Sequence, residues 1–187
     1  SHMINAGSWR RMNDIVQDAA AQGARVVAFN PANELADEAS GVFLPTLLLD
    51  VKDDARAMTE ELFGPILPIK TYKTMDDAVA YINQNDRPLA LYYFDNDNAR
   101  VDALLARTTT GGVVVNDCML HYAQHNLPFG GVGGSGMGAY HGHVGFLTFS
   151  KQTGVFMQNR IVAAVLKRVM KPPYNVWTER MIQFLMR

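Results

Sequence analysis

The sequence predicts an α/β fold in which a parallel-rich sheet is flanked by helices. Between residues 66 and 116, β-rich apolar segments alternate with segments of helical spacing, and the connections are short. A glycine-rich stretch and a basic, apolar tail follow, and neither continues the alternation. We therefore predict an α/β region at residues 4–152 and a separate C-terminal region at residues 153–187. Residues 1–3 are typical of a remnant left by removal of an affinity tag.

The N-terminal part is predicted to form one helix and one strand. Ser8 is a suitable N-cap, apolar residues follow it at helical spacing, and Gly23 is suited to end the helix. Residues 26–29 are a short apolar run, which predicts a buried strand. The polar residues 30–40 predict a loop.

The central alternation predicts the parallel sheet. The apolar, β-rich segment 42–51 predicts a strand pair or one long strand around Pro45, and segment 66–72 predicts another strand. Thr74 is expected to cap a helix, because Asp76 and Asp77 would lie in its first turn, where carboxylates favour the positive end of the helix dipole. Segments 89–94, 96–106 and 112–116 then predict a strand, a helix and a strand.

Residues 126–145 hold eight glycines and Pro128, which predicts a loop of unusual backbone geometry. The stretch from Gly131 to Gly136 matches the dinucleotide-binding fingerprint letter by letter. That fingerprint requires a preceding strand, a helix that opens within it and an acidic residue about twenty positions later. No acidic residue occurs between Asp117 and Glu179. We therefore interpret the segment as a close-packed structural loop.

Neither the single cysteine nor the histidines predict a reactive centre. An activated cysteine needs a base, a cation or a helix N-terminus beside it, whereas Cys118 follows a predicted strand and directly follows Asp117. We predict a half-buried, inert thiol. His121 and His125 lie four residues apart, but Tyr122 stands where a helical zinc motif has glutamate, so no metal is expected.

Composition excludes several classes of partner. The 187 residues carry a formal net charge of -1, which gives no electrostatic argument for nucleic acid. One cysteine cannot form an intramolecular disulfide, so the cytoplasm is the expected compartment. No apolar run has the length of a membrane span, and the N-terminus shows no apolar signal core.

The hexapeptide Glu60-Glu61-Leu62-Phe63-Gly64-Pro65 is the most informative short segment. Gly-Pro ends the segment sharply, and an aromatic ring near a carboxylate can face a flat ring and a sugar together. A solvated helix end with one core phenylalanine would give the same letters, and the residues alone do not decide between these alternatives.

The stretch from about residue 43 to residue 151 resembles the C-terminal part of the aldehyde dehydrogenase superfamily. The resemblance rests on ordered blocks, which include Leu127-Pro-Phe-Gly-Gly131. Residues 137–142 and Pro172-Pro-Tyr174 are most similar to the branch that oxidises fatty and aromatic aldehydes, including coniferyl aldehyde dehydrogenases. The blocks are residues 43–46, 60–65, 77–83, 88–91, 111–116, 127–131, 135–138 and 149–151.

The resemblance implies an α/β fragment of an enzyme that oxidises an aldehyde to a carboxylic acid with NAD or NADP. It places Glu61 on the nicotinamide-ribose hydroxyls and Phe63 beside the nicotinamide. Phe129 matches an aromatic side chain of the substrate tunnel, near which Tyr122 and His125 are also expected. The family's nucleophilic cysteine and general-base glutamate belong upstream of this segment, so we expect the chain as given to be inactive. The alternative is a non-catalytic module that pairs with a partner subunit.

The tail is predicted to mediate association. By the same resemblance, residues 153–157 predict an oligomerisation strand, and 161–170 and 175–186 predict basic amphipathic helices separated by Pro172 and Pro173. Such a helix pair could lie on an anionic membrane. Because the first helix is short and the two prolines interrupt the apolar stripe, we favour docking on protein in a homodimer over membrane binding.

Overall fold

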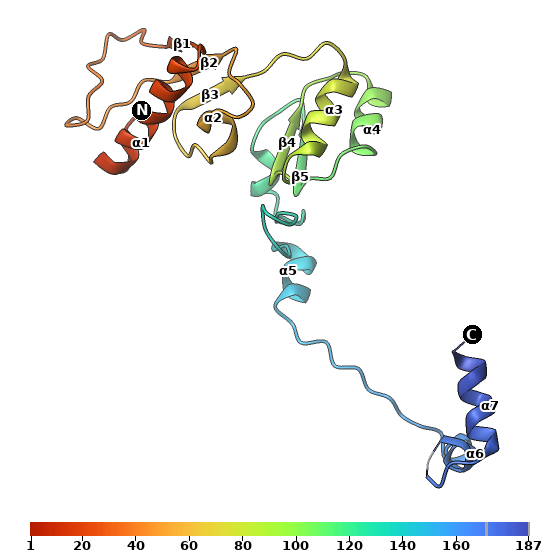
Figure 1. Ribbon diagram of the computed structural model, residues 1–187. Helices are drawn as coiled ribbons and strands as arrows, with labels where there is room; N and C mark the ends of the chain where they lie inside the picture. Colours follow the sequence, from red (N-terminus) through yellow and green to blue (C-terminus); the bar gives the residue numbers. More distant parts are fainter. Residues whose placement is uncertain (171, 187) are drawn as a thin grey trace. The chain divides into compact units, whose positions relative to one another are not determined.

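The computed structural model describes residues 1–170 and 172–186 and divides into two compact units (Figure 1). Unit 1 comprises residues 1–85 and 104–108, and unit 2 comprises residues 86–103 and 109–187. The predicted α/β class is therefore present, but the alternation forms two small sheets, one in each unit. Each unit is described by itself.

Unit 1 is built on a three-stranded sheet with the order β1-β2-β3. Strand β2 lies in the middle, pairs antiparallel with β1 and pairs parallel with β3. In register, Leu48 lies opposite Val26 on one side and Pro68 on the other. The elements are α1 (Ala6–Ala21), β1 (Arg25–Ala28), β2 (Thr46–Leu49), α2 (Arg56–Thr59), β3 (Ile66–Ile69) and α3 (Met75–Gln84).

The core of unit 1 forms where α1 packs on the sheet. Met12 and Ile15 of α1 and Leu48 of β2 are fully buried, because helical spacing places the first two on one face and β2 is central. Burying a side chain of this size stabilises a fold by about 1.5–3 kcal/mol. The ring of Trp9 packs edge-on against Phe43, with 5.7 Å between the centroids.

The predicted cap of α3 is confirmed. The Thr74 hydroxyl accepts a hydrogen bond from the Asp77 backbone N–H at 3.3 Å, and the Asp77 carboxylate accepts one from the Thr74 backbone N–H at 2.9 Å. These reciprocal bonds satisfy two groups that a helix end would otherwise leave without partners. The hydrogen bonds from Thr74 hold the pKa of Asp77 below its ordinary value.

Two expectations for the N-terminal part were wrong. Helix α1 is capped by Asn5, whose side chain accepts the Ser8 backbone N–H at 2.8 Å, so Ser8 lies inside the first turn. Both residues are good N-caps, and the more N-terminal one allows a longer helix. Strand β1 was expected to be buried, but all of its residues are exposed because it is the edge strand.

Unit 2 contains a two-stranded parallel sheet of β4 (Ala90–Tyr93) and β5 (Gly112–Val115). Beyond β5 lie the 3₁₀ helix η1 (Leu120–Ala123) and α5 (Gly142–Thr148). Helix α4 (Asn98–Leu105) connects the two strands, and its last two residues belong to unit 1. The Asn116 amide holds the segment after β4, accepting from the Asp95 N–H and donating to the Asp95 carbonyl, both at 2.9 Å.

The glycine-rich segment and the tail differ in part from expectation. Helix α5 begins at Gly142, so the predicted loop ends earlier than residue 145. Residues 151–159 form no helix or strand, and pairing of 153–157 with a second chain stays a prediction. The two tail helices are confirmed as α6 (Arg160–Met170) and α7 (Val176–Leu185). Within the described residues, no helix combines the length and apolar character of a membrane span.

Candidate functional site

The segment after α2 forms a turn that is held by contacts with two residues of α1. We call residues 60–65 the Glu-Phe turn. The guanidinium of Arg11 donates one hydrogen bond to the Glu61 carbonyl at 2.8 Å and a second to the Leu62 carbonyl at 2.5 Å. Gly64 lies so close to Met12 that a Cβ atom at this position would be 2.5 Å from the Met12 sulfur. The two hydrogen bonds from Arg11 and the packing of Gly64 on Met12 therefore hold the same turn.

The start of the turn is held by an ion pair. The Glu60 carboxylate accepts two hydrogen bonds from the Arg56 guanidinium, at 2.6 Å from Nε and 3.3 Å from Nη2. This bidentate pair holds the pKa of Glu60 below its ordinary value, and the positive charge of Arg11 acts in the same direction. The Glu60 carboxylate thus stabilises the start of the turn.

The two residues predicted to face the cofactor project from this turn. The side chain of Glu61 is exposed and has no hydrogen bond or ion pair with the described residues. Phe63 has a positive φ of 46°, which is uncommon for a residue with a side chain, and its ring is 84% exposed. The turn therefore presents a carboxylate and an aromatic ring from an unusual backbone conformation, without using either for packing.

In unit 2, two of the three predicted tunnel residues line one apolar pocket of about 250 Å³. Tyr122 of η1 and Phe129 of the following loop form part of its wall, and Tyr92 of β4 forms another part. The remaining lining residues are Leu89, Ala90, Met119 and His121. The pocket has almost no polar surface, so it can accept an apolar or aromatic group.

The third predicted tunnel residue, His125, does not line this pocket but belongs to the ring cluster beside it. The ring of Phe129 lies 5.3 Å from His121 and 5.5 Å from Tyr140, and Tyr140 lies 4.3 Å from His141. His125 joins the cluster at 6.0 Å from His141. Both ring nitrogens of His121 and Nδ1 of His141 are buried without a hydrogen-bond partner among the described residues. The imidazole of His121 is therefore positioned by its contacts with the rings of Tyr92 and Phe129.

The glycine-rich segment is close-packed against itself, as predicted. A Cβ atom on Gly131 would lie 2.1 Å from the Ser135 carbonyl oxygen, and one on Gly130 would lie 2.1 Å from the Gly138 carbonyl oxygen. Backbone hydrogen bonds join Phe129 and Tyr140 in both directions at 2.9 Å. The glycines thus permit backbone-to-backbone contact and fix Phe129 beside the pocket.

The structure also shows the surroundings of the single cysteine and of the possible metal ligands. Cys118 is exposed, so its predicted half-burial was wrong; the chain leaves β5 before this residue, and its N–H donates to the Asp117 carboxylate at 2.7 Å. Within the residues that the structure describes, no three His, Cys, Asp or Glu side chains are placed to hold a metal ion.

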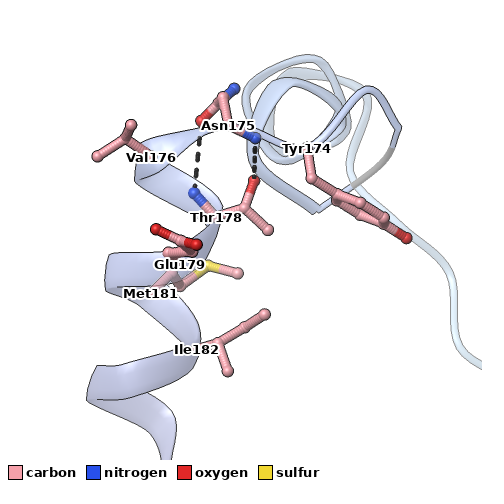
Figure 2. A pocket seen from close by; sticks show the side chains of 7 residues that line it. All are labelled: Tyr174, Asn175, Val176, Thr178, Glu179, Met181 and Ile182. Carbon is pink, nitrogen blue, oxygen red and sulfur yellow. Dashed lines mark hydrogen bonds between the residues drawn. The ribbon is translucent and has the colours of Figure 1, made fainter.

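A larger pocket of about 610 Å³ lies at the start of α7 and holds none of the predicted site residues. Figure 2 shows Asn175 and Thr178 joined by two hydrogen bonds at this helix start, with Tyr174 and Ile182 on the pocket wall. Asn175 and Thr178 serve the cap of α7, and all of the lining residues belong to α7 or directly precede it, so this pocket is a feature of the tail.

Sequence reasoning missed Arg11, which lies fifty residues before Glu61 and has no local signal that links it to the turn. It also did not predict that His121 lines the pocket together with Tyr122 and Phe129. Only the folded backbone brings these residues to their partners.

Comparison with known proteins now identifies relatives. The model of the family described as "Aldehyde dehydrogenase family" matches residues 2–155. The chain is 53% identical over 167 residues to a probable coniferyl aldehyde dehydrogenase of Caulobacter vibrioides, covering 88% of this chain and 34% of that protein. It is 46% identical over 174 residues to a coniferyl aldehyde dehydrogenase of a Pseudomonas species, covering 92% and 36%. These matches confirm the family resemblance.

A solved structure agrees with the sequence matches. The crystal structure of a Mycobacterium tuberculosis aldehyde dehydrogenase complexed with NAD+ superimposes with a TM-score of 0.72 at 27% sequence identity. The superposition covers 84% of this chain and 32% of that one. The chain thus spans about a third of the length of the relatives that it matches.

Proposed function

This chain belongs to the aldehyde dehydrogenase family, and we propose that it is the C-terminal part of an enzyme that oxidises an aromatic or long-chain aldehyde to its carboxylic acid with NAD or NADP. The observation that carries this proposal is the 46–53% identity, over most of the chain, to relatives named coniferyl aldehyde dehydrogenase. The reaction consumes aldehyde, water and oxidised nicotinamide and yields acid, reduced nicotinamide and a proton.

We propose that the Glu-Phe turn binds the nicotinamide end of the cofactor. An exposed carboxylate at Glu61 can accept hydrogen bonds from two ribose hydroxyls, and the exposed ring of Phe63 can lie beside a flat nicotinamide. When bound, the cofactor supplies the hydride acceptor. The residues of this chain would only orient it, since a positioned ring and ribose reduce the entropy lost on reaching the reactive geometry.

We propose that the pocket beside η1 binds the organic part of the aldehyde. Tyr122 and Phe129 offer aromatic surface, and the wall has almost no polar area, which suits a phenyl ring or an alkyl chain. His125 would act through the ring cluster, since it contacts His141 and does not line the pocket.

The chain by itself is expected to be inactive. In the family a cysteine thiolate attacks the aldehyde, and the only thiol here, Cys118, is exposed and has no matching position in the family's nucleophile motif. Purified chain mixed with NAD or NADP and a panel of aromatic aldehydes should give no aldehyde-dependent increase in the absorbance of reduced nicotinamide. Turnover that Cys118→Ser abolishes would show that Cys118 acts as a nucleophile and would contradict the expected inactivity of the chain.

The competing function is a non-catalytic module that pairs with a partner subunit. Genomic sequence directly upstream of residue 4 separates the two functions, because an in-frame cysteine motif of the family supports the enzyme. A stop codon at that place, together with co-purification of a second subunit, would support the module.

We propose that the tail mediates homodimerisation in the cytoplasm. Trp177, Phe184 and Leu185 of α7 are largely exposed, and the stretch 153–157 forms no helix, strand or bridge with the described residues. An apolar helix face and a free backbone are what a second protein surface can cover. Light scattering should give the mass of two copies for the intact chain and of one copy after deletion of the residues from Arg160 onward. Tight binding of the intact chain to anionic vesicles, lost on that deletion, would favour the membrane instead.

A further inference from the structure

The Glu-Phe turn contains one residue, Phe63, in an uncommon backbone conformation. Phe63 adopts a positive φ of 46°, and the carbonyls of the two preceding residues, Glu61 and Leu62, point to the side of α1. A residue with a side chain pays an energetic penalty in this conformation, which therefore persists only when neighbouring groups impose it.

Several contacts hold the turn, and they act at different places. The Arg56–Glu60 ion pair holds its first residue, and the contact between Met12 and Gly64 holds its end. The middle is held in two ways: the Leu62 side chain packs against the core of unit 1, and the two terminal nitrogens of Arg11 each donate to one backbone carbonyl, at 2.8 and 2.5 Å. Of these two contacts, the bonds from Arg11 act directly on the backbone. A planar guanidinium holds two acceptors in a fixed relation, which a lysine ammonium cannot do in the same way.

We propose that Arg11 is a positioning residue for the nicotinamide-binding turn. This inference rests on the proposed function of Glu61 and Phe63. Arg11 fixes the peptide units on either side of Leu62, and these units set the directions in which the Glu61 carboxylate and the Phe63 ring leave the backbone. Arg11 itself donates to carbonyl oxygens and needs no contact with the cofactor.

The neighbouring residue Arg10 provides a matched control. It lies on the same helix and carries the same charge, but its guanidinium pairs with Glu38 at 3.3 Å and donates to the Ala6 carbonyl at 3.4 Å. Both partners lie outside the Glu-Phe turn. Arg10→Gln thus removes one positive charge from α1 and leaves the turn intact.

The first measurement is the carbonyl ¹³C chemical shift of Glu61 and Leu62 in the full 187-residue chain. Loss of a hydrogen-bond donor moves a carbonyl signal upfield. We expect both signals to move in Arg11→Gln, one or both to move less in Arg11→Lys, and neither to move in Arg10→Gln. Unchanged signals in Arg11→Gln would overturn the hold on the turn, and full restoration by lysine would show that charge alone suffices.

The second measurement is saturation-transfer NMR from the chain to nicotinamide mononucleotide at millimolar concentration, which detects weak, fast-exchanging ligands. We expect several-fold less transfer in Arg11→Gln and in Glu61→Gln than in wild type, and wild-type transfer in Arg10→Gln. Wild-type transfer in Arg11→Gln, with its carbonyl signals shifted, would overturn the positioning role alone. No transfer in wild type would instead overturn the nicotinamide role of the turn, and the role of Arg11 with it, while shifted carbonyls would still show that Arg11 holds the backbone.

Discussion

The two units are stabilised by different kinds of contact. Among the residues whose side chains the structure describes, every buried apolar side chain belongs to unit 1, where α1 covers the sheet. Unit 2 relies on the β4–β5 ladder, glycine contacts, ring edges and ion pairs, and the side chains of its sheet are half-buried or exposed. A two-stranded sheet of this kind is marginal in water without further cover. Unit 1 therefore has the elements of an independent core, and unit 2 depends on local geometry.

The largest expected effect tests this difference in burial. Leu48→Ala in β2 should destabilise unit 1 by about 2–5 kcal/mol, because it removes a fully buried side chain and leaves a cavity. The matched change Leu91→Ala in β4 should cost about 1 kcal/mol, since that side chain is only half-buried. Residue-resolved hydrogen exchange of the amides of each sheet measures both effects. Equal losses of protection in the two sheets would refute the comparison.

The same difference explains what the sequence could predict of the fold. In unit 1, helical spacing of apolar residues and the Thr74 cap are local signals, and both predicted the elements that form. The edge position of β1 is not a local property, so the apolar run at 26–29 predicts a buried strand although β1 is exposed. The predicted cap Ser8 was wrong for a different reason: Asn5 has the same capping chemistry and lies three residues earlier, where the helix begins.

The next effect tests whether backbone contact fixes the pocket in unit 2. Gly131→Ala places a Cβ atom 2.1 Å from the Ser135 carbonyl oxygen, so the loop must shift, at a cost of about 1–3 kcal/mol. Gly154→Ala is the matched control, because no atom lies within 4 Å of the added carbon. Near-ultraviolet circular dichroism and the ring NMR signals of Phe129 and Tyr140 should change in the first variant only. If both variants keep the wild-type ring signals, the loop does not position Phe129.

The candidate site was predictable only as far as family resemblance reached. The motif blocks assigned Glu61, Phe63 and Phe129, and the structure leaves these assignments as proposals. Arg11 and His121 lay beyond that reasoning, because a guanidinium bonded to carbonyls fifty residues away and an imidazole between two rings depend on tertiary contact. The exposure of Cys118 was missed for the same reason, since it depends on where the chain leaves β5.

The smallest effect concerns an ion pair of unit 2 and its dependence on pH. Asp95 accepts two hydrogen bonds from the Arg100 guanidinium, both at 2.7 Å, and further bonds from the Asp97 N–H and the Tyr93 hydroxyl. The hydrogen bond from Arg100 is the main cause that holds the pKa of Asp95 well below its ordinary value. Because the folded pKa is the lower one, the pair stabilises the fold fully above the unfolded pKa of about 3.9, and the contribution is lost as pH falls from there toward the folded pKa.

Arg100→Gln tests this dependence, with Arg107→Gln as its control. Arg107 pairs with Asp76 at 2.7 Å in unit 1, and both of those side chains are more exposed than Asp95, which is 14% exposed. We expect the Asp95 carboxyl ¹³C titration to move toward its ordinary midpoint in Arg100→Gln and to stay in place in Arg107→Gln. The loss of protection of β4–β5 amides in Arg100→Gln should be present at neutral pH and should shrink below about pH 4. The ion pair requires the carboxylate form of Asp95, whereas packing of the aliphatic part of the Arg100 side chain does not. A loss of protection that is independent of pH would therefore assign the effect to packing.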